Sequence, residues 1–225
     1  CLATAFGADW AGQHLFGATH ANYHFSETIA FNSFWVISAA ILGGIFGVVG
    51  WFFARSLTKE KTAQPKEDSW LKPWMRYTFL TVVVAFLLLG VSQHLEVTGL
   101  GLGLIDSTLK TNHVPDQTVL KFMFTYVCIA VGLRGGEVTP LFVIGACLGS
   151  SLAGLTNLPV AIGAALGLVT VFAAAGAVPL TGLVLAMELF HPSLAPYAAA
   201  CGLTAWVTTK VFSDFGEGRN SLYAE

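Results

Sequence analysis

Two long apolar segments, separated by a polar and basic stretch, dominate the first half of the chain. Residues 29–54 carry no charged side chain, and at about 1.5 Å per residue they are long enough to cross about 30 Å of hydrocarbon. A second apolar segment covers residues 74–95, with aromatic residues near its start: Trp70, Trp74 and Tyr77. The pattern predicts two membrane-spanning helices that form an antiparallel hairpin.

Shorter apolar segments separated by prolines fill the second half of the chain. Between Val138 and Thr209 the only carboxylate or basic side chains are Glu188 and His191, so this region must lie almost wholly in the membrane or in protein. Helices too short to cross a bilayer are tolerated at membrane depth where their ends face protein or a polar cavity, as in secondary transporters. We therefore expect function at the helix starts, which the prolines mark: Pro140, Pro159, Pro179 and Pro192.

The composition agrees with an all-α polytopic membrane protein. Hydrophobic residues make up 55% of the chain, charged residues make up 11%, and the mean hydropathy is +0.69. This balance leaves too little polar surface for a soluble domain. The net charge of -2 gives no sign of a nucleic-acid partner. Six of the eleven basic residues lie in residues 55–76, in the loop between the two predicted spans and at the start of the second, and the positive-inside rule assigns this loop to the cytoplasm.

Cysteine and histidine give little sign of metal or redox chemistry, so we predict neither a metal nor a cofactor. The histidines before the first span, His14, His20 and His24, match no metal-site spacing, and we interpret them as part of an amphipathic helix and an interfacial loop. Because the chain opens at Cys1 without a methionine or a signal-like segment, we expect a fragment of a longer protein. The four cysteines are interpreted as small core residues: Cys1, Cys128, Cys147 and Cys201.

The segment from Gly135 to Pro140 has the features of an anion-binding helix start. Its two glycines allow the backbone to turn sharply, and Pro140 sets the first helical turn. A helix N-terminus carries roughly half a positive charge and several free amide donors, so it favours an anion that must later be released. Arg134, just upstream, either steers anions toward this place or acts as an interfacial anchor.

Three motifs, in order, resemble those of the CLC anion-transport family. Gly136-Glu137-Val138-Thr139-Pro140, with the small-residue helix after it, resembles the family's GxFxP motif. Pro179-Leu180-Thr181-Gly182 resembles its PLTG helix, and Ser221-Leu222-Tyr223 resembles its PLY motif. The resemblance implies a CLC-type fold with broken and tilted helices. Residues 1–225 would form the C-terminal half of its inverted repeat, with the anion-site motifs in residues 134–225.

The resemblance also implies a transporter rather than an enzyme, present as a multi-pass homodimer in the inner membrane of a bacterium. The backbone amides of Glu137 and Val138 and the hydroxyl of Tyr223 would face the anion, with Gly136 and Thr139 in the same site. The family's gating glutamate and second anion loop belong to its N-terminal half, and neither occurs in this chain.

Two departures from the family motif resemble its fluoride-exporting branch. Val138 stands at the motif's phenylalanine position, and Glu137 occupies the apolar position beside it. An ionised carboxylate repels a nearby anion, so Glu137 must be protonated for part of the cycle or serve another purpose. In the GEVTP version this glutamate and Thr139 belong to the transport site. We therefore predict fluoride export coupled to protons.

Three alternatives stay open. The complete protein could be a chloride channel or a chloride/proton antiporter, or the chain could be a truncated membrane subunit that does not transport. Glu137 itself could snorkel to water without touching the anion.

The resemblance places the homodimer interface at residues 2–16 and 179–211. Small residues there suit close helix packing, either across the interface or within one subunit. We interpret Glu188 as a structural residue at a helix end or at the dimer interface rather than a proton relay, and His191 as a polar helix stop. The small residues are Ala198, Ala199, Ala200 and Gly202.

Overall fold

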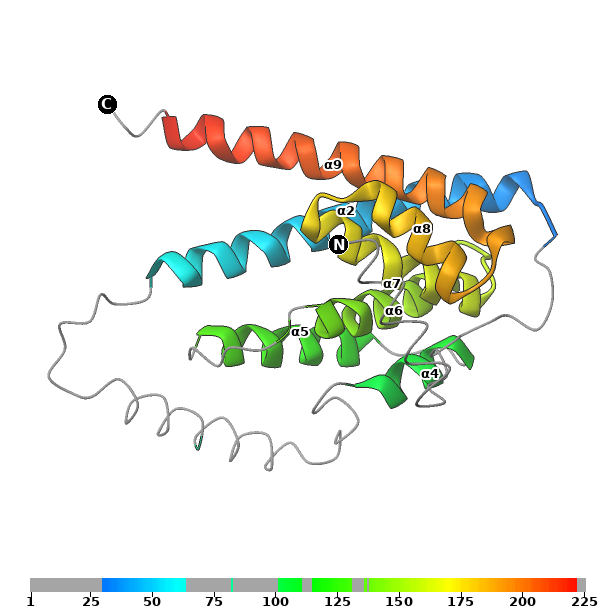
Figure 1. The fold of residues 1–225 in the computed structure, drawn as a ribbon, viewed down its shortest axis with the longest axis horizontal. Helices are drawn as coiled ribbons and strands as arrows, with labels where there is room; N and C mark the ends of the chain where they lie inside the picture. The colour runs from blue at the N-terminus through cyan, green and yellow to red at the C-terminus, as the bar shows by residue number, and fades with distance from the viewer. Residues whose placement is uncertain are drawn as a thin grey trace, which may run out of the picture.

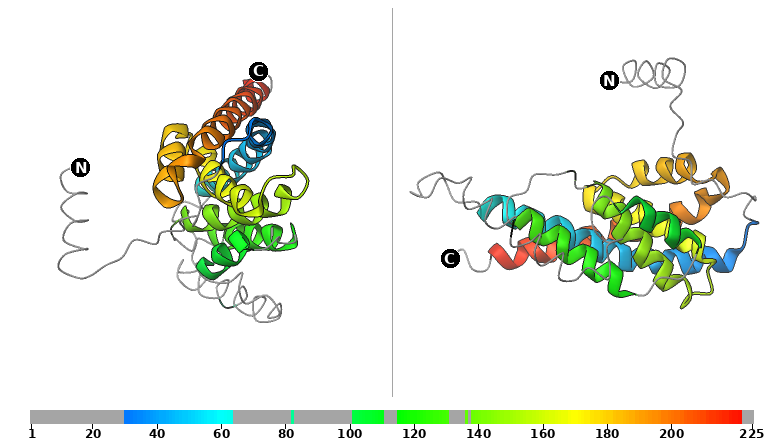
Figure 2. Two further views of the ribbon diagram at one scale, coloured as in Figure 1. Left: turned by 90° about the vertical axis from the view of Figure 1, so that its right-hand side faces the viewer. Right: turned by 90° about the horizontal axis from the view of Figure 1, so that it is seen from below.

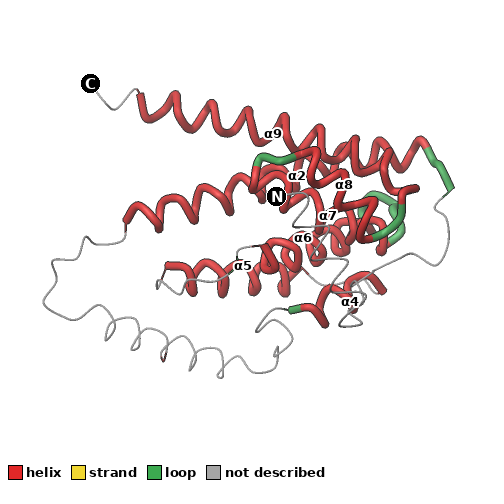
Figure 3. Tube along the Cα trace, in the orientation of Figure 1, coloured by secondary structure: helices red, strands yellow, loops and turns green. Residues whose placement is uncertain are grey.

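The described part of the chain is built from helices of very different lengths. The computed structural model describes residues 30–63, 82, 101–110, 115–130, 136 and 138–221. Among these residues there is no strand (Figure 3), which confirms the all-α fold class. The elements are α2 (Ser33–Ala63), α4 (Leu102–Lys110), α5 (Pro115–Ala130), α6 (Val138–Ala153), α7 (Val160–Gly176), α8 (Pro179–Leu189), the 3-10 turn η2 (Pro192–Leu194) and α9 (Ala195–Ser221).

Helix α2 contains the first predicted membrane span. Its Ser33–Ser56 portion is long and apolar enough to cross a membrane, and it is the one helix in the described ranges that meets this criterion. The helix continues beyond the predicted end at residue 54 as far as Ala63, so the first part of the predicted loop is helical. Lysine, glutamate and alanine are strong helix formers, and basic residues suit a helix C-terminus. The second predicted span, residues 74–95, falls outside the described residues except for residue 82.

Prolines stand at or beside the starts of the later helices, as predicted. Pro179 is at the beginning of α8 and Pro192 at the beginning of η2. Pro159 is the residue before α7, and Pro140 lies in the first turn of α6. Helices α6, α7 and α8 have 16, 17 and 11 residues. Each is therefore shorter than the roughly 20 residues of a typical membrane span.

Helices α6 and α7 cross with their backbones in direct contact. Each contributes two glycines four residues apart, and the pairs meet in antiparallel order. A Cβ atom on Gly145 would overlap the carbonyl of Gly167, and one on Gly149 would overlap the carbonyl of Gly163. The same holds in reverse, since a Cβ on Gly163 would lie 2.7 Å from the carbonyl oxygen of Gly149. Only glycine at these positions permits so close a crossing.

The long helices α2 and α9 lie side by side and form the second extensive contact of the fold (Figures 1 and 2). Gly43 and Gly47 of α2 face α9, where a Cβ on Gly47 would lie 2.6 Å from the carbonyl oxygen of Ala205. One turn further, Gly50 faces α7, with its added Cβ 2.7 Å from the Cβ of Ala174. Helix α2 therefore contacts two helices through glycine positions.

Tyr197, in the first turn of α9, fixes the beginning of α2. Its fully buried hydroxyl accepts a hydrogen bond from the Asn32 amide at 2.9 Å and donates one to the Ala30 carbonyl at 3.1 Å. The ring also lies 6.3 Å from the rings of Phe31 and Trp35, measured between centroids. One side chain thus joins two segments that are 165 residues apart in sequence.

The turn between α8 and α9 confirms that His191 is a polar stop. His191 is the N-cap of η2, and its Nδ1 accepts the Ser193 amide at 3.1 Å. The backbone of His191 is extended, so α8 cannot continue through this residue.

We predict that Gly43→Ala destabilises the protein by about 2 kcal/mol or more, because the methyl group would overlap Thr204 and Cys201 of α9. Gly44 is a matched control, since a Cβ there would come no nearer than 3.9 Å, to the Thr208 hydroxyl. Gly44→Ala should be neutral or stabilise by up to about 1 kcal/mol through helix propensity. Thermal unfolding in detergent compares the two variants, and equal melting temperatures would contradict a glycine-dependent contact.

We predict that Tyr197→Phe loosens the start of α2 while leaving the rest of the fold in place. Loss of the two hydrogen bonds should cost about 1 kcal/mol, and the amides of Asn32 to Val36 should exchange faster with deuterium. Ser56→Ala is the control, because the Ser56 hydroxyl bonds only to the Phe52 carbonyl of its own helix. Unchanged exchange at the start of α2 in Tyr197→Phe would refute the anchoring role.

Candidate functional site

The predicted anion site coincides with the start of α6, which the structure places at the surface of the described region. Gly136 is exposed, with no atom within 4 Å of the position that a Cβ would take. Val138, the first residue of α6, is 46% exposed, although it begins a helix whose next turns are buried. Thr139 and Pro140 are half-buried. The helix start is therefore open while its body is enclosed.

The described part of this site offers backbone donors without a fixed charge. Val138 and Thr139 supply first-turn amides, and Pro140 has none. No acidic residue stands in the first turn of α6, so the positive end of the helix dipole is uncompensated from within the helix. Such an arrangement attracts a small anion and releases it more readily than a lysine or arginine would.

Close packing holds this helix start in position. Leu141 and Val143 are buried directly after the open turn. The ring of Phe142 meets that of Phe172 on α7 edge to face, with 5.2 Å between centroids. The glycine crossing of α6 and α7 follows immediately. The amides of Val138 and Thr139 are therefore carried by a rigid helix pair.

Three predicted residues of the site can be placed, and others cannot. Gly136, Val138 and Thr139 lie together, as their sequence positions require. Glu137, Tyr223 and Arg134 fall outside the described residues, and so do Cys1 and the histidines at 14, 20 and 24. The roles predicted for these residues stay predictions.

A polar face on α5 was not predicted from the sequence. Thr118, Lys121 and Thr125 are all buried, at intervals of three and four residues. Lys121 is 4% exposed, and its Nζ atom would lie 3.4 Å from a Cβ on Gly101. The sequence feature that could have indicated this face is a lysine within an apolar segment, since ionisable residues in such segments are usually functional.

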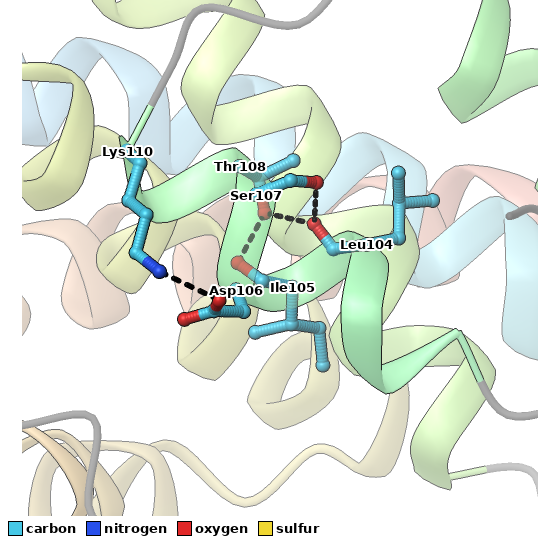
Figure 4. Close-up of polar contacts among 6 residues, drawn as sticks. All are labelled: Leu104, Ile105, Asp106, Ser107, Thr108 and Lys110. Carbon is cyan, nitrogen blue, oxygen red and sulfur yellow. Dashed lines mark hydrogen bonds and ion pairs between the residues drawn. The ribbon is translucent and has the colours of Figure 1, made fainter.

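Several hydrogen bonds and an ion pair form within helix α4 (Figure 4). Lys110 pairs with Asp106 at 2.7 Å, one turn apart on the exposed side. The Ser107 hydroxyl donates to the Leu104 carbonyl, and the Thr108 hydroxyl donates to the carbonyls of Leu104 and Ile105. These contacts stabilise the short helix.

Outside the site, the remaining predicted residues have varied surroundings. Glu188 is exposed, and within the described ranges its carboxylate bonds to no helix end. Ala198 is buried within the subunit, whereas Gly202 has no neighbour within 4 Å of an added Cβ. The described cysteines are free thiols: Cys128 is half-buried, and Cys147 and Cys201 are buried, as predicted for core residues.

Comparisons with known proteins identify relatives of this chain. The family profile described as voltage gated chloride channel matches residues 1–210. A chloride/fluoride channel protein of Pseudomonas syringae pv. tomato is 35% identical over 93% of this chain and 47% of its own length. An H(+)/Cl(-) exchange transporter ClcA of Vibrio vulnificus is 30% identical over 66% of this chain and 34% of its own length.

A solved structure shares the fold. The crystal structure of a CLC-type fluoride/proton antiporter matches 92% of this chain and 51% of its own chain, with a TM-score of 0.80 and 28% sequence identity. The chain thus spans about half the length of the antiporter and of the chloride/fluoride channel protein.

Proposed function

The chain belongs to the voltage-gated chloride channel (CLC) family of membrane proteins, and we propose that it forms the C-terminal half of a transporter that exports fluoride in exchange for protons. The likeness to the chloride/fluoride channel protein over 93% of the chain carries this proposal. The fold shared with a CLC-type fluoride/proton antiporter supports it. The GEVTP sequence before and within the first turn of α6 supports it at the level of residues.

The start of α6 is the proposed fluoride site. The amides of Val138 and Thr139 would donate to the anion from the positive end of the helix dipole. The Thr139 hydroxyl and the Tyr223 hydroxyl would add two further donors. Gly136 leaves the approach to this turn without a side chain.

Glu137 would couple the anion to protons. When ionised it repels an anion at the helix start, and when protonated it becomes a hydrogen-bond donor. Alternation between the two forms would link fluoride release to proton movement. The titrating carboxyl group would then lie at the anion site itself.

Fluoride is a chemically suitable ligand for such a site. It is smaller and more strongly hydrated than chloride, so a site at membrane depth must replace its water closely with donors. It also accepts stronger hydrogen bonds than chloride. Several converging neutral donors therefore favour fluoride more than chloride.

The outward surface of α8 and α9 fits a membrane-embedded homodimer, which we include in the proposal. Leu180 of α8 and Leu203 of α9 are 77% and 62% exposed, and Val184 and Val207 are also exposed. Apolar side chains in these positions suit lipid or a second copy of the chain.

Chloride/proton exchange is the second candidate function. The ClcA proteins of two Vibrio vulnificus strains, each 30% identical over 66% of this chain, favour it. The carboxyl group of Glu137 beside the helix start argues against it, because chloride gains less from a protonated donor.

We predict that fluoride efflux by the complete protein in liposomes becomes very slow or uncoupled from protons in Glu137→Gln, and more so in Glu137→Ala. Glutamine keeps the size and a donor but cannot titrate, whereas alanine removes both. A fluoride electrode and a pH-sensitive dye measure the two fluxes.

Glu188→Gln is the matched control, because it removes a carboxylate from an exposed position on α8. It should transport as the wild type does. Wild-type coupling and selectivity over chloride in both Glu137 variants would remove the main residue-level support for fluoride. Faster wild-type flux of chloride than of fluoride would favour the second candidate.

A further inference from the structure

Helix α5 turns its polar face toward the protein interior and its apolar face outward. Thr118, Lys121 and Thr125 are buried, at the spacing that places side chains on one helix face. The exposed face carries apolar side chains: Val119, Met123 and Val127. A lipid-facing apolar side is expected of a membrane helix, so the inward polar face is the feature that needs a function.

Lys121 brings a buried ammonium group to the junction of α4, α5 and α6. Its Nζ approaches Gly101, whose φ of +72° is the left-handed conformation that glycine adopts easily. A Cβ on Gly101 would also lie 3.1 Å from Val143 of α6, so glycine at this position accommodates both neighbours.

Thr118, one turn before Lys121, has a buried hydroxyl that finds no hydrogen-bond partner in the described part of the chain. It is 8% exposed. The hydroxyls of Thr108, Thr125 and Thr170, which are also buried, each donate a hydrogen bond. Leaving a buried hydroxyl unbonded is unfavourable, so the Thr118 hydroxyl is the group for which a ligand is missing.

We propose that Thr118 and Lys121 hold a small anion between α5, α6 and the start of α4, at a position separate from the start of α6. The Thr118 hydroxyl and the Lys121 ammonium each donate to it. A small anion suits this place, because Val143, which lies beside the same glycine as Lys121, is fully buried. The site rests on the proposed function, since it holds the anion that the protein carries.

Transport kinetics of the complete protein in liposomes test the site. Lys121→Met should raise the half-saturating fluoride concentration roughly tenfold, as expected for the loss of a charge-assisted hydrogen bond. Thr118→Val, which keeps the shape of the side chain, should raise it about threefold. Lys110→Met and Thr108→Val are matched controls, because they remove the exposed lysine of α4 and a buried hydroxyl that is bonded. Both controls should keep the wild-type half-saturation.

Thermal melting in detergent gives a readout that needs no transport. Sodium fluoride or sodium chloride should raise the melting temperature of the wild type relative to sodium gluconate. In gluconate Thr118→Val should melt at the wild-type temperature or above, because it removes an unbonded hydroxyl. Halide should raise the melting temperature of Thr118→Val by less than it raises that of the wild type. If no anion binds to the Thr118 hydroxyl, halide should raise the melting temperature equally in both proteins.

The outcomes separate this inference from the proposed function. A wild type that carries no fluoride overturns the proposed function, and the halide-induced melting shift of Thr118→Val still decides the anion site. If the wild type carries fluoride and Thr118→Val has the wild-type half-saturation and melting shift, the anion site is wrong. Thr118→Val tests the anion site even if Lys121→Met fails to fold. An equal effect of Thr108→Val would also overturn the site.

Discussion

In a bilayer, lipid tails solvate an apolar helix about as well as another helix does, so helix association must come from close packing and interhelical hydrogen bonds. The described fold meets this condition through backbone contact at glycines. Gly145 and Gly149 meet Gly167 and Gly163 at the crossing of α6 and α7, and Gly43 and Gly47 bring α2 against α9. A side chain at any of these positions would separate the helices, and the other contacts between them would be lost with it.

This close packing determines what the start of α6 can do. Backbone amides are weak donors individually, and they bind an anion well only if the helix that carries them does not move. The crossing with α7 begins within two turns of Val138. The hydroxyls of Thr204, Thr208 and Thr209, in contrast, donate to carbonyls of the preceding turn of α9. Donor groups are thereby concentrated at helix starts and on the inward face of α5.

Much of the architecture was predictable from the sequence, because the hydrophobic pattern and the prolines act locally. The span in α2 and the helix starts at Pro179 and Pro192 follow from residues close together in the chain. The pairing of glycines does not follow from such residues. Two glycines four residues apart indicate a face for close packing, but they do not show which helix packs against it. The hydrogen bonds of Tyr197 join residues too distant for any local pattern. The buried position of Lys121 was not predicted, because α5 buries polar side chains and exposes apolar ones, the reverse of the pattern usual for a soluble protein.

The hydrogen bonds between Tyr197 and the residues just before α2 have a consequence for biogenesis. Their partners are separated by 165 residues, which a ribosome needs roughly 10 to 30 s to synthesise. During that time α2 is already made, but it lacks both its terminal anchor and the helix against which Gly43 and Gly47 rest. The face of α2 that carries Gly43 and Gly47 must therefore wait for its partner until α9 is inserted, although α7, which Gly50 contacts, is made earlier. The apolar span of α2 carries no charge, so this face can remain in contact with lipid. A polar side chain on the face would make the incomplete protein less stable and more exposed to membrane proteases.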